Sequence, residues 1–217
     1  MTSTEILQIR DLAIGYGKNE VCASLDLTLQ AGEVLRITGP NASGKSTLAQ
    51  TLVGVLPPLR GEVFIGGHSL RHDPAAAKQL IGYSSGDLPY TTLTGRDHLE
   101  IAAALWGVPR PRVSELLDSF PDWPLVRHID EEIRVYSQGT HQQLAILVAL
   151  VSRPKLLVLD EAFDNIDDQT LGEIFTELRS QVDSGVALVY VSHRHDELWP
   201  SSPQRIYNIK TRESQPA

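Results

Sequence analysis

The chain has 217 residues, 41 % of them hydrophobic, and a formal net charge of −8 from 19 Lys and Arg against 27 Asp and Glu. This apolar share excludes a disordered chain. The single cysteine excludes an internal disulfide. The excess of acidic residues argues against an extended nucleic-acid-binding surface. The longest wholly apolar run, residues 144–151, is too short to span a bilayer, and the polar start is no secretory signal. We therefore expect a soluble, cytoplasmic protein.

Alternating apolar residues predict strands at the start of the chain, with a turn-rich stretch at residues 11–17 and a break at Ala31 and Gly32. A short apolar strand is predicted over 34–38, followed by a glycine-bearing loop. Helical spacing then runs to residue 56, where Pro57 and Pro58 stop it, and another strand is predicted over 62–65. The residues that carry the first strand pattern are Ile6, Leu7, Ile9, Leu25, Leu27 and Leu29.

Residues of about 87–136 are acidic and punctuated by prolines, with helical spacing over 99–106 and 113–120. We interpret them as an inserted helical lobe, in which Trp106 belongs either to the lobe core or to a partner contact. Beyond them, helices are predicted over 142–152 and 169–182, and strands over 156–159, 186–191 and 205–209. This alternation predicts a mainly parallel sheet flanked by helices, and the tail from Thr211 is expected to lack structure.

A phosphate-binding loop is predicted where residues 39–46 fit the pattern G-x-x-x-x-G-K-[ST] between a strand and a helix. Its glycines let backbone N–H groups point at phosphate oxygens, a lysine adds a cation, and a serine hydroxyl can ligate Mg²⁺. The helix that follows directs its positive end at the same anion. The candidate nucleotide-binding residues are Gly39, Pro40, Asn41, Ala42, Ser43, Gly44, Lys45, Ser46 and Thr47.

Two acids, Asp160 and Glu161, end a buried strand at the edge where ligands bind in open α/β sheets. We expect Asp160 to hold Mg²⁺ together with Ser46, and Glu161 to polarise an attacking water. The alternative is a pair of solvated acids at a strand end.

These motifs together resemble the nucleotide-binding domain of ATP-binding cassette (ABC) proteins. The phosphate loop is followed by YSQGTHQQL at 136–144, by LLVLDE at 156–161 and by VSH at 191–193. The resemblance implies an α/β P-loop NTPase of ABC type, with a mainly parallel sheet, an antiparallel β subdomain and an inserted α-helical lobe. One domain would span 1–210, with its core at 1–86 and 137–210, the lobe at 87–136 and a tail at 211–217.

By resemblance, Ser137 and Gly139 would contact the γ-phosphate of ATP bound by a second cassette, and Asp167 would lie at the dimer seam. Tyr16 would stack on adenine, and His193 would bond the γ-phosphate. Ser137 also stands at a favoured N-cap position, so its helix would face an anion.

Plainer alternatives stay open for several of these residues. Tyr16 could be a surface tyrosine in a glycine-rich turn, and Ser137 an ordinary helix cap. His193 with His195 is a weak metal pattern, and Cys22 fits a buried small residue.

The sequence departs from the family at two places. The family usually has a glutamine where this chain has Gly86, and Asp87 or Ser85 would have to substitute for it. Tyr136 begins a signature of the form Tyr-Ser-x-Gly, which resembles export-type cassettes. These departures leave nucleotide binding intact and put the rate of hydrolysis in question.

The resemblance implies an ATPase subunit that binds ATP and Mg²⁺, dimerises head to tail as a homodimer or cassette heterodimer, and drives an exporter. Separate permease subunits would supply the membrane spans, so the chain would be peripheral at the inner face of the cell membrane, with no nucleic-acid partner. The alternatives are a soluble cassette ATPase outside transport and a nucleotide-gated clamp that hydrolyses ATP slowly, which Gly86 motivates. ATP against GTP selectivity stays open.

Overall fold

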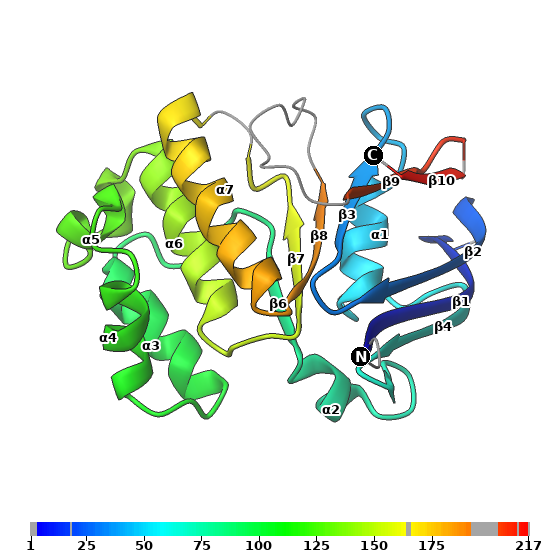
Figure 1. Cartoon of the computed structure of the whole chain (residues 1–217), viewed down its shortest axis with the longest axis horizontal. Coiled ribbons are helices and arrows are strands. Elements are labelled where there is room, and N and C mark those ends of the chain that lie inside the picture. Colours follow the sequence, from blue (N-terminus) through cyan, green and yellow to red (C-terminus); the bar gives the residue numbers. More distant parts are fainter. Residues whose placement is uncertain (1–3, 18, 164–165, 192–203, 212, 217) are drawn as a thin grey trace.

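A six-stranded sheet lies at the centre of the computed structural model, which describes residues 4–17, 19–163, 166–191, 204–211 and 213–216 (Figure 1). Its strand order is β10-β9-β3-β8-β7-β6, and all neighbours are parallel except β9 and β10. The strands are β3 (Val34–Thr38), β6 (Ile81–Ser84), β7 (Leu156–Asp160), β8 (Ala187–Val191), β9 (Gln204–Asn208) and β10 (Glu213–Pro216). The predicted fold class, a mainly parallel α/β sheet, is confirmed.

The tail was expected to lack structure, and that expectation is wrong for its central part. Residues 213–216 form β10, which pairs antiparallel with β9 from Glu213 opposite Asn208 to Pro216 opposite Arg205. The sheet thus gains an edge strand from a polar segment, because backbone hydrogen bonds to β9 do not require an apolar side-chain pattern.

A four-stranded antiparallel sheet lies beside the first, in the order β2-β1-β4-β5. Its strands are β1 (Glu5–Tyr16), β2 (Asn19–Gln30), β4 (Arg60–Ile65) and β5 (His68–Ser69). Leu25, Leu27 and Leu29 are buried on one face, as their alternation predicted. Residues 11–16 of the stretch expected to be turn-rich instead form the second half of β1, and Gly17 alone is a turn residue. Register shifts and a positive φ of 43° at Asp11 let the strand continue through these residues.

The two faces of the central sheet belong to two hydrophobic clusters, because successive side chains on a strand point to opposite sides. Leu156, Val158 and Val189 pack with α1 (Lys45–Leu52) and the antiparallel sheet. Leu157 and Tyr190 pack with α6 (Gln138–Leu150), α7 (Asp168–Asp183) and the helical lobe. The short α2 (Pro74–Lys78) connects β5 to β6.

Helix α1 ends at Leu52, four residues before the predicted end. Gly54 has φ 71°, and its N–H donates to Thr51 O at 3.1 Å, while the Val55 N–H donates to Gln50 O at 2.9 Å. These two bonds form a Schellman-type cap, which stops the helix before Pro57 is reached.

The lobe contains α3 (Gly95–Leu105), α4 (Pro111–Asp118), α5 (Pro124–His128) and the 3₁₀ turn η1 (Ile133–Val135), at the end of the molecule away from the antiparallel sheet (Figure 1). Its core includes Leu99, Leu116 and Trp123. Trp106 is 41 % exposed, so its interpretation as lobe core is wrong. Among the described helices, none has the length and apolar character needed to cross a bilayer.

Candidate functional site

The loop between β3 and α1 is held tightly against two distant parts of the chain. A Cβ on Gly44 would overlap Val21 Cγ1, and one on Gly39 would lie 2.7 Å from Ile209 Cγ2. Larger residues at either position would therefore push the loop away from β2 and from the segment after β9. The predicted glycines allow this close approach because they have no side chain.

Helix α1 begins at this loop with its backbone donors directed toward an anion site. Its N-cap is Gly44, which has no side chain to accept a hydrogen bond from the first turn. Ser43 Oγ is also buried and has no hydrogen-bond partner among the described residues. A helix N-terminus whose donors have no side-chain cap favours a bound anion such as phosphate.

Lys45 is buried, with 5 % exposed surface, and folds back over the loop. Its Nζ donates to Gly39 O at 3.1 Å and to Pro40 O at 2.9 Å. Two carbonyl oxygens carry only partial charge, so the ammonium is available for a stronger anionic partner. This is the role that the sequence predicts for it.

Ser46 and Asp160 meet at the carboxyl end of β7, where Ser46 Oγ donates to Asp160 Oδ1 at 3.1 Å. Burial raises the pKa of Asp160 from 3.8 to about 6, and Glu161 adds to this shift, while Ser46 and Lys45 oppose it. A hydroxyl and a buried carboxylate are hard oxygen ligands, and a divalent cation would offset the cost of the buried charge. The two residues therefore fit Mg²⁺.

Glu161 follows with a positive φ of 55° and an exposed side chain. It shares a cavity of about 820 Å³ with Tyr16, which is 56 % exposed, and with the phosphate loop. This volume falls within the range of small-molecule sites. The cavity is lined by Tyr16, Val21, Asn41, Ala42, Gly44, Lys45, Ser46, Thr47 and Glu161. The structure thus brings together the predicted aromatic, loop and acidic residues, and adds Val21, which carries no motif signal.

The signature residues lie at a different hollow of about 400 Å³, which includes Ser137 and Thr140 and shares no lining residue with the first cavity. Ser137 is the N-cap of α6, and its Oγ accepts from the Thr140 N–H at 3.1 Å, as predicted.

Gly139 faces α7, since a Cβ there would lie 3.2 Å from Thr170 Cγ2. Asp167 caps α7 by accepting from the Thr170 N–H at 2.9 Å, which lowers the pKa of its carboxyl. Gly139 and Asp167 therefore adjoin the same threonine.

Gly86 follows β6 with φ 80°, and a Cβ there would lie 2.8 Å from Gln142 Nε2. Gln142 is 4 % exposed, and its Oε1 has no hydrogen-bond partner within the described ranges. The signature helix thus occupies the space beside Gly86, a contact that the sequence pattern does not reveal. His193 and His195 lie outside the described residues.

A family model described as ABC transporter matches residues 22–164. The linearmycin resistance ATP-binding protein LnrL of Bacillus subtilis is 28 % identical over 89 % of this chain and 63 % of its own length. The cytochrome c biogenesis ATP-binding export protein CcmA of Bordetella bronchiseptica is 33 % identical over 84 % of this chain and 81 % of its own. The chain spans 9 % of a rat ATP-binding cassette sub-family A member 7, which is 32 % identical over 90 % of this chain.

Solved structures share the fold. An ATP-binding subunit of an ABC transporter superposes with a TM-score of 0.82 at 24 % identity, covering 93 % of this chain and 85 % of that one. A dimeric ATP-binding cassette bound to ADP and Pi gives a TM-score of 0.77 at 21 % identity, covering 94 % of each chain.

Proposed function

The chain belongs to the ABC transporter family of ATPases, and on that premise we propose that it drives an exporter by forming a head-to-tail dimer around ATP. One observation carries this proposal: the cavity at Lys45 and the hollow at Ser137 are separate. Each chain then offers two half-sites, and a second cassette, identical or different, completes both.

Binding in the first half-site uses groups already in position. Lys45 exchanges its two carbonyl partners for phosphate oxygens, the first turn of α1 donates its N–H groups, and Tyr16 stacks on the base. Ser46 and Asp160 hold Mg²⁺. When bound, Mg²⁺ neutralises phosphate charge and fixes the orientation of the outer phosphates.

Glu161 acts as the general base. Its carboxylate takes a proton from a water that attacks the γ-phosphorus, and the bond from that phosphorus to the bridging oxygen breaks, leaving ADP and phosphate. Asp160 is buried whereas Glu161 is exposed and lines the cavity, so the two adjacent acids have different roles. Ser137 of the second cassette stabilises the γ-phosphate, with the N-terminus of α6 behind it.

Glu161→Gln tests the dimer. This variant keeps binding and loses proton abstraction, so saturating MgATP should convert it from monomer to dimer in light scattering. A variant that stays monomeric while binding MgATP would contradict the proposal. Lys45→Ala is the matched control: in the same background it should lose ATP binding and dimerisation together.

We propose that a helix of a separate transmembrane subunit docks beside Trp106, which places the cassette at the inner face of the membrane. A groove of about 310 Å³ there lies between the end of α1, β6 and α6. Leu105, next to it, is 82 % exposed, and Ile101 is 43 % exposed on the same helix. Leu105→Asp should abolish co-purification with the membrane partner and leave MgATP affinity unchanged; retained co-purification would overturn the docking assignment.

Gly86 favours a second candidate, a nucleotide-gated clamp with slow hydrolysis, because the glutamine side chain that the resemblance leads us to expect near Mg²⁺ and the attacking water is absent. Single-turnover hydrolysis with and without the membrane partner separates the two. Fast, partner-stimulated turnover supports the exporter, and slow turnover with stable ATP dimers supports the clamp.

A further inference from the structure

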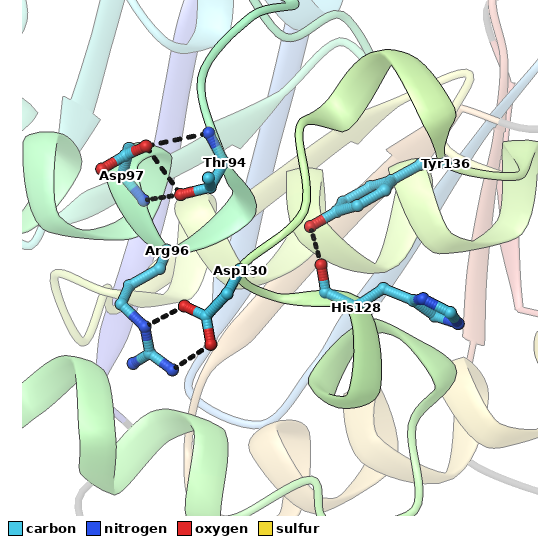
Figure 2. A network of polar contacts seen from close by, with 6 residues as sticks. All are labelled: Thr94, Arg96, Asp97, His128, Asp130 and Tyr136. Atoms are coloured by element: carbon cyan, nitrogen blue, oxygen red, sulfur yellow. Dashed lines mark hydrogen bonds and ion pairs between the residues drawn. The ribbon is translucent and has the colours of Figure 1, made fainter.

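The residue before the signature serine is joined to the helical lobe through its side chain. Tyr136 Oη donates to the carbonyl of His128, the last residue of α5, at 2.8 Å (Figure 2). Gly95, the first residue of α3, lies against the same hydroxyl, since a Cβ built on it would be 2.5 Å from Tyr136 Oη. One hydroxyl therefore connects the start of one lobe helix with the end of another.

Two backbone donors in the first turn of α3 have partners outside the ladder of helix hydrogen bonds. The Arg96 N–H donates to Ile129 O at 2.8 Å, and the Asp97 N–H donates to Thr94 Oγ1 at 3.0 Å. Gly95, the first residue of this turn, packs against the Tyr136 hydroxyl. Removing the hydroxyl leaves the His128 carbonyl without this donor, which costs free energy wherever water cannot replace it.

A second connection holds the same two segments together. Arg96 pairs with Asp130 through Nε to Oδ1 at 2.6 Å and Nη2 to Oδ2 at 3.3 Å (Figure 2). Both side chains are partly exposed, so this pair contributes little to stability on its own. It joins the segment after α5 to α3, and Tyr136 joins the end of α5 to the residue before Ser137.

The contact between Tyr136 and Gly95 is close enough to constrain both residues. A Cβ on Gly95 would lie 2.5 Å from Tyr136 Oη and 3.0 Å from Ile129 Cδ1. Burial raises the pKa of Tyr136, so the hydroxyl stays protonated and able to donate at neutral pH. A phenylalanine here would keep the ring but could not donate to His128 O.

We propose that the Tyr136 hydroxyl is a positioning group, which sets Ser137 and the start of α6 against α3 and α5 and thereby controls the affinity of the signature for ATP bound by the second cassette. Tyr136 directly precedes Ser137, the N-cap of α6, and both line the same hollow. A shift of the tyrosine therefore moves the serine. This inference rests on the proposed head-to-tail dimer.

Tyr136→Phe in the Glu161→Gln background tests it. Loss of one net hydrogen bond should raise the dimer dissociation constant at saturating MgATP about 3- to 10-fold. The affinity of the monomer for MgATP should not change, because Tyr136 lies outside the first cavity. Tyr90→Phe is the matched control, since that tyrosine is 69 % exposed, and it should leave dimerisation unchanged.

The outcomes separate the two proposals. If Glu161→Gln alone stays monomeric, the head-to-tail dimer fails; if it dimerises and Tyr136→Phe does so equally well, only the positioning role fails. A fall in monomer MgATP affinity would also overturn that role, because it would indicate general damage.

Gly95→Ala provides an independent variant that disturbs the same hydroxyl. It should weaken dimerisation in the Glu161→Gln background, and its effect should shrink when Tyr136→Phe is also present, because the closest contact of the new Cβ is then gone. Strictly additive effects of the two substitutions would contradict a direct contact between these residues.

Discussion

Asp160 shows how a binding residue can reduce the stability of the empty protein. The residue is 4 % exposed, and burial raises the pKa of its carboxyl from 3.8 to about 6. A raised folded-state pKa means that the unfolded state releases the proton more easily. The free energy of unfolding is therefore unaffected by this group below about pH 4 and falls as the pH rises through about 6.

Asp160→Asn should remove this penalty in nucleotide-free protein kept in a chelator. At pH 7.5 the variant should be more stable than the parent by on the order of 1–3 kcal/mol, and the difference should vanish near pH 4. Urea denaturation at both pH values measures it. Asp167→Asn is the control, since hydrogen bonds from Thr170 lower the pKa of that exposed carboxyl and no stabilisation at pH 7.5 is expected. A pH-independent difference for Asp160→Asn would be inconsistent with titration of a buried carboxyl.

Gly86→Gln restores the residue usual in the family and should nevertheless destabilise this chain. Gly86 has φ 80°, and its Cβ would lie 2.8 Å from Gln142 Nε2. We expect a loss of about 1–2 kcal/mol in the free energy of unfolding, measured by urea denaturation. Gln142→Ala in the same chain should recover the part due to the contact. An unchanged urea midpoint for Gly86→Gln would show that Gln142 and α6 can accommodate the new side chain without loss of stability.

At the scale of the helices, the N-termini differ in how their free backbone N–H groups are satisfied. Thr94, Ser137 and Asp167 each cap their helix with a side-chain oxygen, whereas α1 begins at Gly44 without such a cap. Capping residues satisfy donors internally, and an uncapped start leaves them to a ligand. Helices α2, α4 and α5 also lack a side-chain cap, but each begins with a proline, which has no N–H to satisfy, so the contrast still fits α1 as the phosphate-binding helix.

Thr94→Ala should lower the free energy of unfolding by about 1 kcal/mol, because it removes the hydroxyl half of the α3 capping box and leaves the bond from the backbone N–H of residue 94 to Asp97 in place. Thr94 Oγ1 accepts from the Asp97 N–H, and Asp97 Oδ2 accepts from the Thr94 N–H at 2.9 Å (Figure 2). Thermal denaturation measures the change, and Thr94→Ser should retain most of the stability. Equal losses in both variants would point to the threonine methyl group instead of the cap.

The apolar and polar pattern of the sequence predicted helices and strands best where a single interaction, such as burial of both faces of a strand, determines the structure. The buried strands β3, β7 and β8 were predicted to within a residue or two because uniform apolar runs leave little alternative. The end of α1 was missed because a cap at Gly54 acts before the prolines that mark the sequence. β1 was broken too early because Asp11 and the glycines after it favour turns, while pairing on both sides keeps the strand extended.

At the scale of the whole molecule, the helical lobe shares its core with the central sheet. Leu99 and Trp123 belong to the same cluster as Leu157 and Tyr190. Clusters that are continuous across two segments favour cooperative unfolding of both. The lobe is therefore part of one folding unit, although it is inserted between two halves of the core.

Urea unfolding should accordingly give one transition. Tryptophan fluorescence of a Trp199→Phe variant, which then reports the lobe residues Trp106 and Trp123, should coincide with far-UV circular dichroism of the whole chain. Equal midpoints and slopes are the expected result. Separate midpoints would mean that the lobe unfolds independently.

Candidate site residues could be predicted from the sequence where they belong to a local motif. They could not be predicted where they depend on contacts with distant residues. The residues from Gly39 to Thr47, Asp160 and Ser137 were identified because their spacing follows from how phosphate, Mg²⁺ and a helix cap are bound. The supports of these residues, Val21, Ile209 and the Gly95 contact of Tyr136, were not identified. They contact the site only through tertiary packing between distant parts of the chain, and such contacts leave no motif in the sequence.

The packing of Ile209 beneath Gly39 has a consequence for synthesis of the chain. The phosphate loop leaves the ribosome before β8 and β9, but β3, which carries it, pairs with both of these strands, and Leu35 lies opposite Val189 and Arg205. A nascent chain that contains the complete loop motif therefore still lacks both neighbours of β3. Nucleotide can stabilise the fold only once β8 and β9 have docked, so ATP acts after these strands are in place and not on an earlier folding intermediate.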